Sequence, residues 1–206
     1  IKMKMILKSV VIVAGLAGSL GASAAGDVEA GKSASAICAG CHGADGNSAI
    51  ASFPKLAGQG DKYLLKQMND IKDGRRPVVE MTGMLDALSK QDMENVAAYF
   101  AAQSVTPGQA KKELVEKGEI LYRQGNPATQ VAACTACHGP AGDGVVLASF
   151  PALAGQHADY IAAQLKKFRS GERTNDGDTR MMRSVAARLN DKEIEAVASY
   201  ISGLYK

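Results

Sequence analysis

Apolar residues recur along this chain at the spacing of an α-helix, and the same pattern occurs twice. Those between residues 93 and 100 fall at i, i+3, i+4 and i+7, and those between 194 and 201 repeat the spacing. Ser89 and Asp92 have the spacing of a capping box, and Asn190 is a candidate N-cap. No segment alternates like a strand, so an all-α fold is expected, with further helices over residues 27–37, 63–73, 110–123 and 160–170.

The two halves of the chain are related by an internal duplication. The segment at 53–59 (FPKLAGQ) recurs at 150–156 (FPALAGQ), 97 residues later, and near the C-terminus the offset rises to 101. The second copy therefore has four extra residues, which we place around 173–178. The duplication predicts two similar domains, and a Thr-Pro-Gly turn near residue 106 marks the connection between them. The expected boundaries are domains 25–104 and 113–206 with a linker 105–112.

Residues 1–24 have the features of a secretory signal peptide. Lys2, Lys4 and Lys8 form a positive region before an apolar stretch, and a small-residue cleavage pattern ends at Ala24. The alternative is a retained membrane anchor, but the apolar stretch is shorter than the roughly 20 residues that a spanning helix needs. We therefore expect an exported protein cleaved after Ala24.

Composition and charge exclude several function classes. Hydrophobic residues make up 46% and charged residues 22%, which is ordinary for a globular protein. The net charge of +3 is too weak for nucleic-acid binding, and removal of the three signal lysines cancels it. A polybasic membrane contact is therefore not supported, although the sequence does not exclude a loose association with a membrane. Aromatic residues are only 5%, which suggests a core partly filled by a cofactor.

Every cysteine lies in one of two Cys-x-x-Cys-His motifs, formed by Cys38, Cys41 and His42 and by Cys134, Cys137 and His138. This motif is the attachment pattern of haem c, in which two thiols form thioethers and the histidine binds the iron. A zinc site needs four ligands, and each motif offers three. A thioredoxin-like motif belongs with a βαβ pattern, which is absent, and plain disulfides leave the adjacent histidines unexplained. Two covalently bound haem c groups are therefore expected.

The second axial ligand of each iron is expected to be methionine. The third histidine, His157, corresponds to Gly60 in the first copy, so two bis-histidine haems are impossible. At the local offset of 101, only Met81 and Met182 correspond to each other, and they are the expected ligands. His157 is expected on the surface or in a loop. Met68 and Met93 match Leu165 and Ile194, which indicates core positions.

Proline carbonyls are candidate partners for the iron-binding histidines. Pro54 and Pro151 occupy matched positions and follow His42 and His138 by 12 and 13 residues. A ligating histidine usually donates its second N–H to a carbonyl or carboxylate, and proline retains its C=O. The alternative is that these prolines only shape a loop.

The mature sequence resembles the cytochrome c4 family of exported bacterial diheme cytochromes. The resemblance rests on both Cys-x-x-Cys-His motifs, the two Phe-Pro-x-Leu-Ala-Gly-Gln segments, and the segments 80–85 (EMTGML) and 173–179 (RTNDGDT). It implies two tandem class I cytochrome c domains with pseudo-two-fold symmetry, iron ligation by His42 with Met81 and by His138 with Met182, and thioethers at all four cysteines. It also implies a periplasmic electron carrier of a respiratory chain, between a membrane quinol-oxidising complex or dehydrogenase and a terminal oxidase.

Two other functions remain in competition with the electron carrier. One is the diheme subunit of a flavin-dependent sulfide dehydrogenase or a similar dehydrogenase complex, whose cytochrome subunit is similar. The other is an enzyme in its own right, a diheme peroxidase, which requires an open or displaceable sixth position at one iron. Paired methionines argue against the peroxidase.

Overall fold

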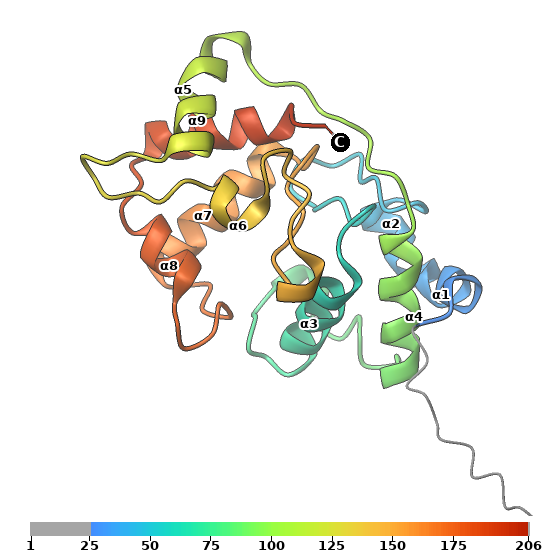
Figure 1. Ribbon diagram of the computed structural model, residues 1–206. Coiled ribbons are helices and arrows are strands. Elements are labelled where there is room, and N and C mark those ends of the chain that lie inside the picture. The colour runs from blue at the N-terminus through green and yellow to red at the C-terminus, as the bar shows by residue number, and fades with distance from the viewer. Residues whose placement is uncertain (1–25, 206) are drawn as a thin grey trace, which may run out of the picture.

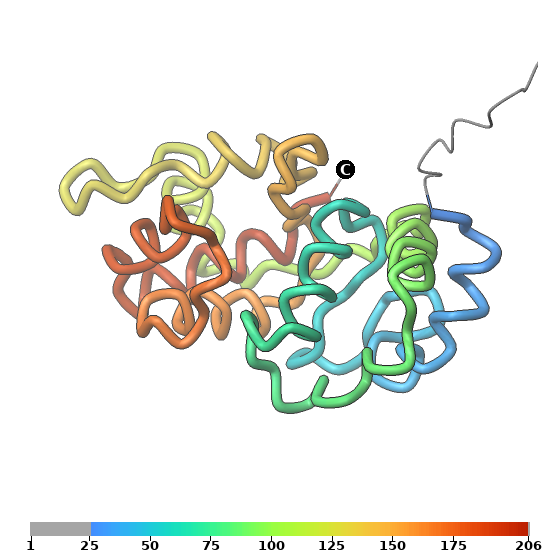
Figure 2. Tube along the Cα trace, turned by 90° about the horizontal axis from the view of Figure 1, so that it is seen from below, coloured from blue at the N-terminus to red at the C-terminus, as the bar shows by residue number. Residues whose placement is uncertain are grey.

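The computed structural model describes residues 26–205, and the predicted signal peptide with its cleavage site lies outside them. Two helical units follow each other along the chain and lie side by side (Figures 1 and 2). The first contains α1 Val28–Ala34, α2 Ala39–His42, α3 Asp61–Lys72 and α4 Lys90–Ala101, with short 3₁₀ turns at Ser35–Cys38 and Val79–Met81. The second contains α5 Val115–Gln124, α6 Thr135–His138, α7 Ala158–Ser170, α8 Met181–Ala186 and α9 Asp191–Ser202, with 3₁₀ turns at Lys112–Leu114 and Val146–Ala148.

The all-α prediction is confirmed for the described residues, which contain two isolated β-bridges and no sheet. The boundaries differ from the expected ones in places. The helix expected over 27–37 is α-helical only to Ala34, and the one expected over 110–123 becomes helical only at Lys112. Lys111 has extended backbone instead, and its N–H donates to Ser199 Oγ at 2.9 Å. The short helix α8 was not predicted.

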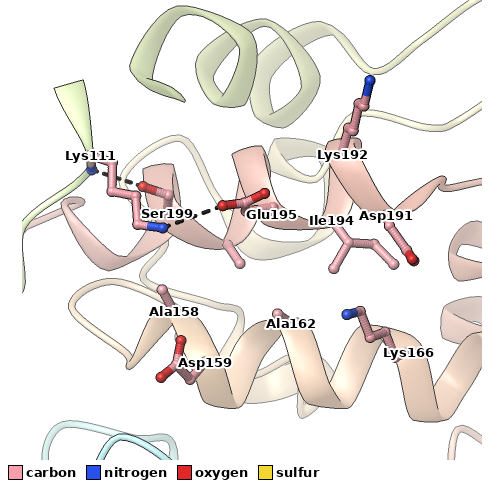
Figure 3. A pocket seen from close by; sticks show the side chains of 11 residues that line it. Lys111, Ala158, Asp159, Ala162, Lys166, Asp191, Lys192, Ile194, Glu195 and Ser199 are labelled. Carbon is pink, nitrogen blue, oxygen red and sulfur yellow. Dashed lines mark hydrogen bonds and ion pairs between the residues drawn. The ribbon is translucent and has the colours of Figure 1, made fainter. Parts of the chain in front are cut away.

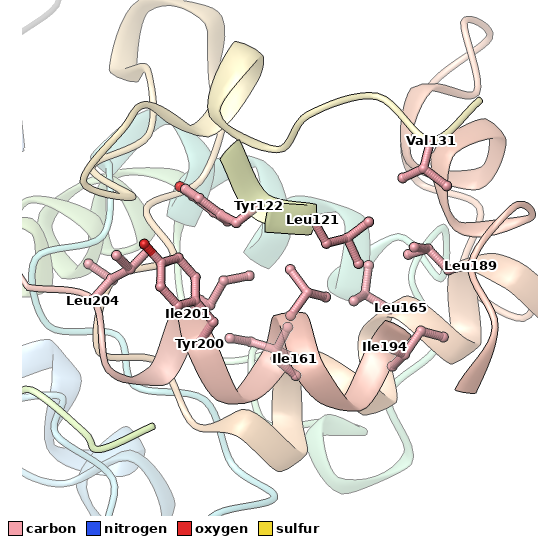
Figure 4. Packing of buried hydrophobic residues seen from close by; sticks show 13 residues of the cluster. Leu121, Tyr122, Val131, Ile161, Leu165, Leu189, Ile194, Tyr200, Ile201 and Leu204 are labelled. Atoms are coloured by element: carbon pink, nitrogen blue, oxygen red, sulfur yellow. The ribbon is translucent and has the colours of Figure 1, made fainter. Parts of the chain in front are cut away.

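Each unit has its own apolar core, built around its last helix. In the second unit, α5 crosses α9, and residues such as Tyr122, Ile194 and Val197 are almost fully buried between α5, α7 and α9 (Figure 4). In the first unit, α1 crosses α4, where Val96 and Phe100 are buried. Met93 is buried as predicted, and Met68 packs partly buried against this core.

The helix caps that the sequence predicts are present. Ser89 Oγ accepts the N–H of Asp92 at 3.1 Å, while the Asp92 carboxylate accepts the N–H of Ser89 at 3.0 Å. Asn190 and Glu193 form the same capping box before α9. These bonds satisfy N–H groups that the first turn of each helix leaves without partners.

Replacing Ser89 by alanine is expected to lower the free energy of unfolding by about 1 kcal/mol, because the cap loses its side-chain acceptor. Chemical denaturation of the two proteins measures this. Lys90→Ala is the matched control, since the Lys90 side chain is 84% exposed at the next position. If Ser89→Ala and Lys90→Ala lowered the free energy of unfolding equally, this would contradict a specific contribution of the Ser89 cap to stability.

The two units are joined by reciprocal hydrogen bonds. Gln156 bridges to the main chain of Lys55, with its Oε1 and Nε2 each 2.9 Å from Lys55 N and O. Gln59 makes the equivalent pair of bonds to Ala152, at 2.8 and 2.9 Å. At the offset of 97, Lys55 corresponds to Ala152 and Gln59 to Gln156. The pseudo-two-fold axis therefore maps one pair of bonds onto the other, as in an isologous interface, where both partners use the same surface.

His157 lies in the loop directly before α7, as predicted, where it is partly buried at this interface. Its Nε2 is 2.8 Å from the carbonyl oxygen of Ser48 in the first unit, and it forms the N-cap of α7. On the opposite side of the pseudo-two-fold axis, Gly60 precedes α3 and faces Val146.

No helix among residues 26–205 is long and apolar enough to cross a membrane.

Candidate functional site

The first Cys-x-x-Cys-His motif forms one short helical segment. Cys38 ends a 3₁₀ turn and packs partly buried against the first core, while Cys41 is exposed on α2. His42 ends α2 and is only 8% exposed. Gly43 then reverses the chain with φ of 81°, and a Cβ there would lie 2.8 Å from the Asn47 carbonyl oxygen, so glycine is required. The turn fixes where the histidine ring lies relative to the loop that follows.

The second motif repeats this arrangement. Cys134 packs partly buried against the second core, Cys137 is exposed, and His138 is 8% exposed at the end of α6. Gly139 follows with φ of 78°. One cysteine of each motif is therefore held by the core, and the other lies at the surface.

Both histidines are oriented by proline carbonyls, as the sequence suggested. His42 Nδ1 is 2.9 Å from the oxygen of Pro54, and His138 Nδ1 is 2.9 Å from the oxygen of Pro151. Because a carbonyl only accepts, Nδ1 carries the hydrogen and Nε2 keeps its lone pair for a metal. Burial lowers the pKa of both imidazoles below the ordinary histidine value, and it outweighs the carbonyl bond, which raises it. Each ring is therefore neutral at neutral pH, which is the form that binds iron.

The four cysteines form no disulfide, which leaves every sulfur free to form a thioether. Burial raises the pKa of Cys38 and of Cys134 to about 11, so both are neutral thiols. A zinc site needs four ligands, and no group of three or more His, Cys, Asp and Glu side chains within residues 26–205 is arranged to hold a metal ion. The donor set thus fits a covalently attached haem c better than a zinc ion.

The methionines differ in their surroundings. Met182 lies on α8 and packs against the same core cluster as Cys134, while its neighbour Met181 is 44% exposed. Met81 ends a 3₁₀ turn and, with Leu85, lines a hollow of about 380 Å³ beside the end of α3. The structure therefore brings Met182 and its cysteine motif to one core, whereas Met81 lies in a loop beside a hollow.

A second hollow, of about 270 Å³, lies between α7 and α9 (Figure 3). Its lining carries charges of both signs, and two of the lining residues, Lys111 and Glu195, form an ion pair at 3.3 Å. Its lining contains no cysteine, histidine or methionine. This hollow is therefore separate from the haem motifs.

Comparisons with known proteins agree with this geometry. The sequence matches the Cytochrome c family over residues 28–104 and 115–204. It is 55% identical to cytochrome c4 of Pseudomonas aeruginosa, over 98% of this chain and 100% of that protein. It is 41% identical to the thiosulfate dehydrogenase electron acceptor of Stutzerimonas stutzeri, over 83% of this chain and 80% of that protein.

The solved structure of reduced recombinant cytochrome c4 from Pseudomonas stutzeri superposes with a TM-score of 0.86 at 55% identity, covering 88% of this chain and 100% of that one. The similarity thus extends over both helical units and both Cys-x-x-Cys-His motifs. The chain belongs to the cytochrome c4 family of diheme electron carriers.

Proposed function

We propose that this protein carries electrons through a periplasmic respiratory chain, using two haems with histidine and methionine ligands. His42 with Met81 and His138 with Met182 would bind the two irons, and Cys38, Cys41, Cys134 and Cys137 would form the thioethers. The observation that carries the proposal is the pair of buried histidines, each with Nδ1 on a proline carbonyl and with no hydrogen bond to Nε2 among residues 26–205. Each of the two predicted domains, 25–104 and 113–206, would hold one haem, and the linker 105–112 would connect them.

When bound, each haem supplies a one-electron Fe(II)/Fe(III) couple. The protein sets its potential and access. The proline carbonyls hold the rings in one tautomer, and the methionines would raise the potential relative to a second nitrogen ligand. With both axial positions occupied, neither iron would bind substrate, so an electron carrier is favoured over a peroxidase.

The proposed donor is a membrane quinol-oxidising complex or a dehydrogenase, and the proposed acceptor is a terminal oxidase. A second candidate function, the electron-accepting partner of a sulfur-oxidising dehydrogenase, is supported by the relative named as a thiosulfate dehydrogenase electron acceptor. It extends the sulfide dehydrogenase alternative suggested by the sequence. Stopped-flow experiments distinguish the two donors, because they measure the rate at which the protein is reduced by quinol-fed membranes and by such a dehydrogenase at matched concentration.

The exported protein is expected to contain two covalent haems per chain, both low-spin. Absorbance spectra of the oxidised and reduced forms, with haem quantified per chain, measure this. The oxidised form should show the far-red charge-transfer band of methionine–iron ligation. One haem per chain, or a high-spin signal, would contradict the ligand assignment and favour the peroxidase.

A further inference from the structure

The loops that follow the two Cys-x-x-Cys-His motifs are closed in different ways. In the second domain, Val145 and Phe150 form an antiparallel bridge, in which each N–H donates to the carbonyl oxygen of the other residue at 3.0 and 3.1 Å. At the offset of 97, the corresponding residues of the first domain are Ser48 and Phe53, and no such bridge joins them in the described part of the chain. The loop at 48–53 is therefore held by other contacts.

Ser48 supplies the contacts that come from within the first domain. Its buried Oγ lies 3.0 Å from the carbonyl oxygen of Cys41 and 3.1 Å from that of Ile50, and it accepts the N–H of Ile50 at 3.1 Å. Cys41 directly precedes His42 in the first motif. The hydroxyl thus ties the loop to the main chain of the motif, which Val145 at the matched position of the second domain cannot do.

His157 holds the same residue from the second domain. Its Nε2 is 2.8 Å from the carbonyl oxygen of Ser48, and because a carbonyl only accepts, Nε2 carries the hydrogen and donates it. The main-chain N–H of His157 donates to Gln156 Oε1 at 3.0 Å, and Gln156 also bonds the main chain of Lys55 across the domain contact. The ring is therefore attached to a fixed point of the domain contact, at the start of α7.

This contact has no counterpart on the other side of the pseudo-two-fold axis. Gly60 occupies the matched position before α3, and a Cβ there would meet only Val146, at 3.6 Å. Within residues 26–205, no side chain of the first domain donates a hydrogen bond to the loop at 145–150, which its own bridge closes. The second domain therefore holds the loop of the first, whereas the first domain does not hold the loop of the second in this way.

The loop that His157 holds leads directly to the groups that orient His42. Phe53 ends the loop, and its ring centroid lies 6.4 Å from that of His42. Pro54 follows, and its carbonyl oxygen is 2.9 Å from His42 Nδ1. A hydrogen bond at Nδ1 makes a ligating imidazole more basic, and a more basic ligand favours Fe(III) over Fe(II). The position of this loop thus affects how strongly the proposed ligand stabilises oxidised iron.

We propose that His157 is a positioning residue for the first haem: from the second domain, it holds the loop that sets the hydrogen bond between Pro54 and His42. The inference rests on the proposed function, because His42 must bind iron. The effect runs in one direction only, since Gly60 cannot act on the second haem in the same way. His157 therefore makes two haems with the same types of axial ligand inequivalent.

The test uses the full-length holoprotein with His157→Gly, the residue that the first copy has at this position, after haem content has been measured. A looser loop weakens the bond at His42 Nδ1 and favours Fe(II), so the potential of the first haem is expected to rise. The equilibrium constant for its reduction should increase on the order of threefold, where tenfold corresponds to 59 mV for a one-electron couple. The second haem should keep its potential. Spectroelectrochemical titration measures both, and adding Met182→Ala to the same protein identifies the potential of the second haem.

Three matched variants separate the hydrogen bond from other effects of the substitution. His157→Gln keeps an N–H donor near the place of Nε2 and should retain the potential of the wild-type protein. His157→Phe keeps a ring but has no donor, so it should shift the potential as His157→Gly does, and it serves if the glycine variant does not retain both haems. Gln59→Ala removes hydrogen bonds between the domains at Ala152, and should lower stability without changing the potential of the first haem.

Some outcomes would overturn the proposal. An unchanged first potential in His157→Gly or His157→Phe would make the bond to Ser48 a purely structural contact. Equal shifts at both haems would show that the substitution acts through the whole domain contact, and so would a shift of the first haem in Gln59→Ala. A shifted potential in His157→Gln would show that the N–H donor is not what matters. If the wild-type protein carries no haem, the proposed function itself fails, and this is read from the haem content alone.

Discussion

Replacing Met182 by alanine is expected to lower the potential of one haem and to open that haem to external ligands. A methionine sulfur opposite histidine holds the potential high, and its removal leaves a position for water, imidazole or cyanide. About half of the far-red charge-transfer absorbance should be lost, because one of the two proposed methionine–iron bonds would be absent. Spectroelectrochemical titration and imidazole binding to the oxidised protein measure both effects, and Met81→Ala should give the same result at the other haem.

The neighbouring methionines provide the controls. Met181 is 44% exposed directly before Met182, and Met84 lies three residues after Met81 in the same loop. Met181→Ala and Met84→Ala should retain the full far-red charge-transfer absorbance and bind no imidazole. If Met181→Ala loses half of this absorbance while Met182→Ala keeps it, or Met84→Ala loses it while Met81→Ala keeps it, the methionine chosen from the repeat is the wrong one.

The sequence predicts those parts of the structure that local patterns determine. The helices α4 and α9 were found because one face of each packs on a core, which places apolar residues at helical spacing. The two histidine–proline bonds were anticipated because a ligating histidine needs an acceptor and both copies hold proline at the matched place. The duplication strengthened each of these inferences, since chance patterns are not repeated at a constant offset.

Long-range contacts were harder to predict. His157 gave no sign of its bond to Ser48, because the two residues are 109 positions apart and glycine replaces the histidine in the first copy. The helix α8 has six residues, too few for a periodic pattern. A loop at 125–133 separates α5 from the second Cys-x-x-Cys-His motif, and the antiparallel bridge between Asn126 and Val131 closes it. The first copy has no equivalent loop between α1 and its motif.

The sequence does contain a sign of the two buried arginines at the contact between the domains. Arg76 and Arg173 share the offset of 97 with the matched tyrosines and glutamines of α3 and α7. Polar residues that both copies retain at one offset are unusual on a helix surface that faces water. Such a set indicates a polar contact between the copies, and the structure places all six side chains there.

Gly118→Ala is expected to destabilise the second domain by about 3 kcal/mol or more, because the added methyl group has no space. A Cβ at Gly118 would lie 2.4 Å from both the Ala196 carbonyl oxygen and the Tyr200 Cβ, where α5 crosses α9. The backbone of α9 cannot move away without disturbing its buried face. Denaturant unfolding followed by far-UV circular dichroism measures the loss.

Gly60→Ala provides the contrast, since a Cβ there would approach no described atom closer than 3.6 Å. It should lower stability by about 1 kcal/mol or less, because Gly60 is the N-cap of α3, where alanine is less favourable than glycine. Gly31→Ala in the first domain should resemble Gly118→Ala, as its Cβ would lie 2.0 Å from the Asn95 carbonyl oxygen at the crossing of α1 and α4. A stable Gly118→Ala protein would mean that the helix crossing is looser than the structure shows. Parallel losses at Gly31 and Gly118 would show that both copies depend on the same close contact, which aligns the first helix of each domain with the core that its cysteine motif packs against.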